Sequence, residues 1–178
     1  MTNKFSLLIF FNLLVAFGVC QSNVNKLSSK IMYTAPDKTV WKTYRDEINP
    51  NKSKGVLIYQ HVPITDSKGR TIEPVIAFIY ERQNSIVDPV KYAEAALAKK
   101  QFNPKYTRQG GYPQYSSDKH SAVYAGEYTR DGIKHKVVLG YICCNSIGIE
   151  IVCDATDEVF KNVEADMTAF LRSVKVRD

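Results

Sequence analysis

The sequence has few of the residues that enzymes use most often at their active sites. Its three histidines, His61, His120 and His135, are separated by at least 14 residues, so none has the H-E-x-x-H or H-x3–5-H spacing of a metal site. No G-x-S-x-G elbow, phosphate-binding loop or dinucleotide-binding fingerprint is present. These absences favour a protein that binds over one that catalyses. We therefore predict no catalytic residue, no metal site and no cofactor.

The chain also lacks a concentrated charge of either sign. Its formal net charge is +6, but no run of five or more like charges occurs. Scattered charges are typical of a solvated surface, whereas nucleic-acid binding needs a basic stripe with stacking aromatic residues. We expect no nucleic-acid partner, and instead another extracytoplasmic protein or a component of the cell envelope.

Long apolar runs are confined to the start of the chain. Lys4 precedes a mainly apolar segment, residues 5–19, whose polar residues are Ser6 and Asn12. This pattern is typical of a secretory signal with a cleavage point before Gln21. The segment is short and polar for a membrane anchor, which needs about 20 apolar residues.

The predicted organisation follows from this cleavage point. Residues 1–20 are the expected signal peptide, 21–30 a polar leader, and 31–178 a single domain without an integral membrane span. We expect the mature protein to be secreted or periplasmic. Cys20 leaves an alternative open, because a lipoprotein signal ends at a cysteine that anchors the chain to the surface. Val19 fits that signal poorly, so we expect simple cleavage.

Three of the four cysteines, Cys143, Cys144 and Cys153, lie within eleven residues. A hairpin turning at residues 145–146 would place Cys144 opposite Ile147. In that register Cys144 and Cys153 share one face several residue pairs apart, and Cys143 points to the other face. A disulfide between Cys144 and Cys153 is then excluded, because its α-carbons must lie within about 7 Å.

We interpret these cysteines as parts of core strands, Cys144 and Cys153 being small apolar core residues. An odd number of cysteines after signal cleavage leaves at least one thiol free or paired between chains. The alternative is a thiol- or metal-dependent enzyme that uses Cys143, Cys144 or His135.

Hydrophobic periodicity and turn residues predict an α+β fold. The expected strands lie within residues 31–41, 56–64, 73–82, 120–130, 133–144 and 149–155, and the expected helices within 87–102 and 157–171. Polar loops are expected at 46–55 and 103–119. Because the later strands are joined by tight turns, the sheet should be mainly antiparallel and flanked by helices, an α/β/α sandwich.

Both expected helices have capping residues and an apolar stripe. Asp88 and Pro89 suit the start of the first helix, and Thr156 the start of the second. The residues expected to face the core are Val90, Ala93, Ala96 and Leu97 in the first helix, and Phe160, Val163, Met167, Phe170 and Leu171 in the second.

Aromatic residues in the 103–119 loop are the best candidates for binding. Tyrosine and arginine are enriched where proteins contact partners. The alternative is a loop that folds its own tyrosines onto the sheet. His135 follows a turn and lies between two lysines, which adds it to the candidates. The predicted binding residues are Tyr106, Arg108, Tyr112, Tyr115 and His135.

The last third of the chain resembles the PsbP-like family, named for an extrinsic subunit of photosystem II. The matching features are Glu127 with Tyr128, Gly132 to His135, the acidic segment 154–157, and Ser173 near the end of the last helix. The segment "VDPVKYAEAAL" is similar to a helix of the family. Val174 replaces the family's Phe.

The resemblance implies an antiparallel sheet between helices and a non-catalytic binding or assembly role. Metal binding in the family could carry over only to His135. Photosystem binding does not carry over, because nothing in the sequence indicates a photosynthetic host.

Overall fold

The structure is a computed structural model. It describes residues 24–26, 31–49, 51–83, 88–99, 105–108, 120–144 and 146–177, with the backbone alone at 24–26 and 105–108. No helix in this part of the chain is both long and apolar enough to cross a membrane.

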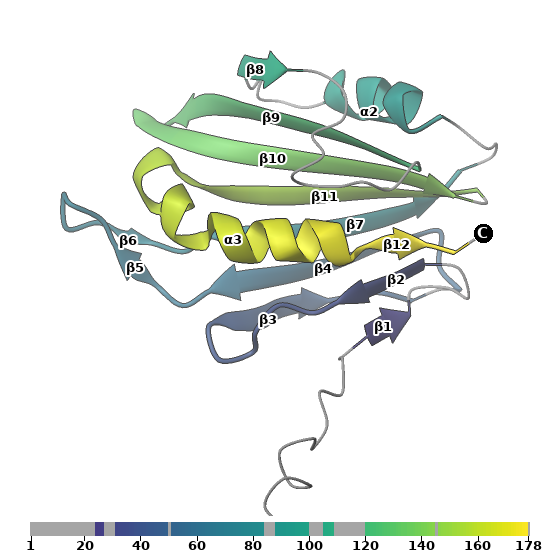
Figure 1. The fold of residues 1–178 in the computed structure, drawn as a ribbon, viewed down its shortest axis with the longest axis horizontal. Coiled ribbons are helices and arrows are strands. Elements are labelled where there is room, and N and C mark those ends of the chain that lie inside the picture. Colours follow the sequence, from purple (N-terminus) through teal and green to yellow (C-terminus); the bar gives the residue numbers. More distant parts are fainter. Residues whose placement is uncertain are drawn as a thin grey trace, which may run out of the picture.

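A seven-stranded antiparallel sheet forms the centre of the molecule, in the order β3-β4-β7-β11-β10-β9-β8 (Figure 1). Its strands are β3 (Trp41–Asp46), β4 (Lys54–His61), β7 (Val75–Arg82), β8 (Lys105–Arg108), β9 (Ser121–Arg130), β10 (Ile133–Cys144) and β11 (Ile147–Thr156). The helices are α2 (Pro89–Leu97) and α3 (Asp157–Ser173). The predicted α+β class is confirmed.

The two long hairpins have the turns and the register that the sequence predicts. Asp131 and Gly132 join β9 to β10 with φ angles of 51° and 74°, the left-handed conformation that two-residue hairpin turns require. Between β10 and β11, Cys144 pairs with Ile147 and Cys153 pairs with Val138. Cys143 therefore points to the opposite face from Cys144 and Cys153, as predicted.

Helix α3 runs along the strands on one face of the sheet (Figure 1). Its five predicted inward residues are all buried, and they pack with Ile76, Phe78 and Ile151 into the larger apolar core. Thr156 occupies the N-cap position as predicted, but its side chain makes no capping hydrogen bond. Asp157 and Glu158 instead complement the positive end of the helix dipole.

Helix α2 packs on the other face, against β9 and β10, and a second core forms there. Asp88 caps it as predicted, because its carboxylate accepts hydrogen bonds from the backbone N–H groups of Val90 and Lys91. The prediction that Val90 faces the core is wrong, since its side chain is 40% exposed. Tyr92 and Ala93 are the buried residues of this helix.

The edge strand β3 was not expected. After the buried Trp41, its residues are exposed and mostly polar, so they carry no apolar alternation. Trp41 has the anchoring role that its size suggests, because its indole N–H donates to the Asp166 carboxylate of α3 at 3.0 Å. The edge of the sheet is thereby fastened to the helix that covers it.

Two small sheets complete the fold. One has the order β1-β2-β12, formed by β1 (Val24–Lys26), β2 (Ile31–Thr34) and β12 (Lys175–Val176). β1, which lies in the predicted leader, and β12, near the end of the chain, pair with opposite edges of β2. The other is the hairpin of β5 (Ile64–Thr65) and β6 (Thr71–Ile72).

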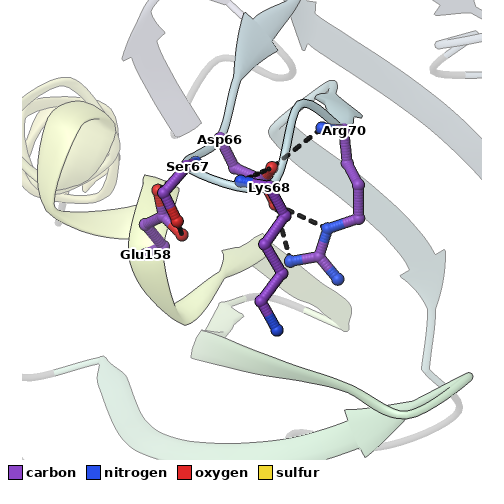
Figure 2. A network of polar contacts seen from close by, with 5 residues as sticks. All are labelled: Asp66, Ser67, Lys68, Arg70 and Glu158. Atoms are coloured by element: carbon purple, nitrogen blue, oxygen red, sulfur yellow. Dashed lines mark hydrogen bonds and ion pairs between the residues drawn. The ribbon is translucent and has the colours of Figure 1, made fainter.

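Polar contacts fasten the β5–β6 hairpin to the start of α3 (Figure 2). The buried Asp66 carboxylate accepts hydrogen bonds from the backbone N–H groups of Lys68 and Arg70 and from the Arg70 guanidinium. The backbone N–H and the hydroxyl of Ser67 both donate to Glu158 of α3, at 2.6 and 2.8 Å. Burial raises the pKa of Asp66, but the hydrogen bonds from Arg70 outweigh it and leave that pKa below its ordinary value. This network ties the β5–β6 hairpin to the start of α3.

Candidate functional site

A cavity of about 290 Å³ lies between α2 and the face of the sheet on which α2 packs. We call it the α2 pocket. Its lining combines small and aliphatic groups with two residues of each charge: Lys54, Ile79, Glu81, Gln83, Tyr92, Ala95, Ala96, Lys99 and Glu150. A cavity on the α3 face, at about 140 Å³, has half this volume. A further cavity beside α3, lined by Asp166 and Phe170, measures about 160 Å³, so the α2 pocket is the largest of these three.

The strands place both carboxylates of the α2 pocket on the same face. Glu81 lies on β7 and Glu150 on β11, where Glu150 pairs directly with Ile79. Because side chains alternate along a strand, residues 79 and 81 and their partners on β11 all point toward α2. Glu81 ends the apolar run "VIAFIYE", and Glu150 interrupts the apolar sequence "IEIVC". These two acids are the sequence signal for this site, and neither is among the residues predicted to bind.

Hydrogen-bond donors converge on the two carboxylates. Glu81 accepts from the Gln83 side-chain amide at 2.8 Å and from the Tyr92 hydroxyl at a long 3.4 Å. Its other oxygen lies 3.4 Å from the ammonium of Lys54. Glu150 accepts from the hydroxyl of Tyr141 at 3.1 Å. Glu81 is thus contacted by an amide, a phenol and an ammonium group, and Glu150 by a phenol.

A glycine lets Tyr92 reach this cluster. A β-carbon at Gly148 would lie 2.7 Å from Cζ of Tyr92, closer than side chains can approach. The ring consequently rests on the backbone of β11, at 5.9 Å from the ring of Tyr141. Burial first, and then the charges of Glu81 and Glu150, raise the pKa of Tyr92 well above its usual range. Tyr92 therefore stays neutral and acts as a donor.

The cysteines are poorly suited to nucleophilic chemistry. Burial first, and then the carboxylate of Asp88, raise the pKa of Cys143 to about 11. Burial also raises the pKa of Cys153, which is fully buried in the α3-side core. The thiolate is the reactive form, so we expect both thiols to react slowly at neutral pH.

The register of β10 and β11 keeps Cys144 and Cys153 several residue pairs apart, as predicted, and no disulfide joins the three cysteines of the described residues to one another. Cys153 has the core position expected for it, whereas Cys144 is only half-buried. Within the described ranges, no three His, Cys, Asp or Glu residues gather in a way that could hold a metal ion.

His135 lies in a network of three side chains on the α2 face of the sheet. Its Nδ1 is 2.8 Å from the Asp154 carboxylate, and its ring stacks on Tyr128 with 5.0 Å between ring centres. The Tyr128 hydroxyl donates to the other oxygen of Asp154. Burial and the nearby Asp154 raise the pKa of Tyr128. With 19% of its side chain exposed, His135 is held mainly by contacts inside the protein.

The structure describes the backbone of two of the other four predicted binding residues. Tyr106 and Arg108 lie on β8, whose backbone pairs with β9 opposite Gly126 and Ala125. Tyr106 therefore pairs with a residue of β9 two positions before Tyr128, whose ring stacks on His135. Tyr112 and Tyr115 lie outside the described residues, as does Cys20.

Comparisons with known proteins identify a similar fold but no family. No protein-family model matches the chain, and no curated protein matches it. Among solved structures, the chain is similar to LpqN of Mycobacterium tuberculosis, a protein involved in cell envelope biogenesis. The TM-score is 0.50 at 12% sequence identity, and the match covers 85% of this chain and 87% of LpqN. At that identity the likeness shows a shared fold.

Proposed function

We propose that this protein is an exported, non-catalytic binding or assembly module, and that it contacts its partner through the α2 pocket. The observation that carries the proposal is the pocket itself. An opening of about 290 Å³ combines apolar walls with carboxylate, ammonium, amide and phenol groups, which is the usual composition of a ligand site. The expected partner is another extracytoplasmic protein or an envelope component.

Three further observations support this proposal. The start of the chain has the composition of a secretory signal. The fold is shared with LpqN, which is involved in cell envelope biogenesis. The thiol beside the pocket, Cys143, has its pKa raised to about 11, which disfavours the alternative of a thiol enzyme. We also propose kinship with PsbP-like proteins, on the sequence resemblance alone.

Photo-crosslinking in the native cells tests this function. A photoreactive amino acid is placed at Lys99, which lines the α2 pocket, and separately at Lys91, an exposed residue of the same helix outside the lining. We expect a discrete crosslinked product, identified by mass spectrometry, from position 99 and none from position 91. Equal products from both positions, or none from position 99, would contradict a binding role for this pocket.

A further inference from the structure

The α2 pocket brings side chains of both charges together. Glu81 and Glu150 lie on its sheet side, on β7 and β11. Lys54 lines it from β4, and Lys99 from just beyond the end of α2. A cation that enters the described lining meets two ammonium groups, and an anion meets two carboxylates. Because a charge is costly to desolvate unless it is well paired, this lining favours a ligand without net charge.

The same side chains supply hydrogen-bond donors and acceptors next to each other. The Lys54 ammonium lies 3.4 Å from Oε2 of Glu81, and the Gln83 amide donates to Oε1 of that carboxylate at 2.8 Å. A hydroxyl group both donates and accepts, so it can donate to the carboxylate while it accepts from the ammonium or the amide. A ligand with several hydroxyl groups therefore fits the Lys54–Glu81 pair without separating it, whereas a charged ligand competes with one of its members.

The backbone beneath the pocket leaves recognition to side chains. β4, β7 and β11 are internal strands, each paired on both sides. They offer no free edge for the strand addition by which extended peptides are commonly bound. Ile79, Ala95 and Ala96 instead provide an aliphatic surface, which suits the C–H face of a sugar ring. The volume of about 290 Å³ lies at the lower end of the range for ligand sites, so it fits a small molecule or one unit of a longer one.

We propose that the α2 pocket binds a neutral sugar unit, whose hydroxyl groups bridge the carboxylates of Glu81 and Glu150 and the ammonium of Lys99. The C–H face of the sugar lies against Ala95 and Ala96. This inference rests on the proposed function, since it names the class of ligand that the binding site recognises. The partner is then a neutral saccharide, and the envelope component of the proposed function is one that presents such a unit.

A matched set of glycosides tests the inference by NMR titration of the mature protein. The neutral probes are the methyl glycosides of glucose, galactose, mannose and N-acetylglucosamine. The amino and uronate analogues of the glycoside that binds carry a positive or a negative charge on the same ring. We expect saturable binding of at least one neutral glycoside, and binding of both charged analogues should be at least about tenfold weaker, the usual effect of one poorly paired charge. The amide signals of Ala95 and Ala96 should shift on binding, whereas that of Thr168 on α3 should not.

Lys99→Met gives the most specific readout. It removes one donor and leaves the two carboxylates in excess over the remaining lysine of the lining. The neutral glycoside should bind about tenfold more weakly, the usual effect of losing one charge-assisted hydrogen bond, while the amino analogue should bind more tightly than to the wild type. A merely structural role of Lys99 predicts the same loss for both ligands. Lys91→Met removes an exposed cation of α2 outside the lining and should change neither affinity.

Each other outcome overturns the inference. Failure of every neutral glycoside to bind, equal binding of a charged analogue, or signal shifts confined to residues outside the lining would contradict the sugar assignment. An unchanged preference between the two ligands in Lys99→Met would contradict it as well. If no glycoside binds but photo-crosslinking at position 99 gives a discrete product, the sugar assignment is wrong and the proposed function stands. If a glycoside binds at Ala95 and Ala96 and crosslinking gives no product, the proposed contact with a partner in the cell is wrong instead.

Discussion

The ring of Tyr92 lies directly against Gly148, so that a β-carbon at residue 148 would stand 2.7 Å from its Cζ atom. This contact joins α2 to β11 and determines how far the Tyr92 hydroxyl reaches into the α2 pocket. The close approach depends on the missing side chain of a glycine in a strand. The geometry of the candidate site therefore rests on one pair of residues 56 positions apart in the sequence.

Gly148→Ala should displace Tyr92 and destabilise the protein by about 1–3 kcal/mol, the usual cost of overpacking a filled core. Chemical denaturation measures the change. The double variant Tyr92→Leu with Gly148→Ala removes the ring that the new β-carbon would meet. Its loss of unfolding free energy should be smaller than the sum of the losses in the two single variants. Strictly additive effects would show that the two residues do not interact.

Alkylation of Cys143 should be slow in the folded protein. With a pKa of about 11 against an ordinary value of 9.0, the thiolate fraction at pH 8 falls roughly a hundredfold. Iodoacetamide labelling followed by peptide mass spectrometry measures the rate in native and unfolded protein. If Cys143 is labelled as fast in the native protein as in the urea-unfolded protein, the alternative of a reactive thiol is supported.

The same raised pKa predicts a loss of stability in alkaline solution. The unfolded chain releases the Cys143 proton near pH 9, whereas the folded chain keeps it until about pH 11. Between these values the folded state binds more protons, so the free energy of unfolding falls as the pH rises. Below pH 9 the contribution is fully present.

Cys143→Ala isolates this effect from that of other buried groups. Between pH 9 and 11, the variant should lose less stability than the wild type, by an amount on the order of 2 kcal/mol. Urea denaturation at several pH values measures the difference. Parallel pH profiles would show that the Cys143 thiol titrates alike in both states.

Asp88→Ala should cost about 1 kcal/mol, because the carboxylate caps two backbone N–H groups at the start of α2. Asp88→Ser keeps a capping oxygen and should recover most of the loss. Hydrogen exchange at the amides of Val90 and Lys91 reports the change locally. Unchanged exchange in Asp88→Ala would contradict the capping role.

The intact mass of the mature protein tests the predicted processing. Simple cleavage gives a chain that begins at Gln21 without any modification. A chain that begins at Cys20 with the added mass of a diacylglycerol would instead establish the surface lipoprotein. Cys20→Ser serves as the control, because it prevents lipidation at residue 20 and leaves simple cleavage before Gln21 possible.

The hairpins could be predicted from the sequence because their determinants are local. Asp131 and Gly132 favour the left-handed turn, and the alternation of β10 and β11 leaves few registers, so the positions of all three cysteines follow. The apolar stripe of α3 could also be predicted, because a long helix with regular apolar spacing buries one face.

The edge strand β3 and the α2 pocket could not be predicted from local sequence patterns. β3 is an exposed edge held by pairing with β4, so its residues show no apolar alternation. The position of Tyr92 depends on Gly148, a contact between distant segments that no local pattern encodes. The tyrosines within residues 103–119 were candidates because of their composition, although Tyr106 lies on strand β8 and not in the predicted loop. Glu81 and Glu150 come together only through strand pairing.

Native mass spectrometry of the protein isolated from its own cells tests the central claim most directly. Wild type and the control variant Lys91→Trp should carry the same non-covalently bound molecule or partner, and Ala96→Trp, which fills the α2 pocket, should carry none. The bound species should be chemically unchanged when released, as a binding module requires. An equal complex in all three proteins, or no complex in any of them, would contradict binding through the α2 pocket.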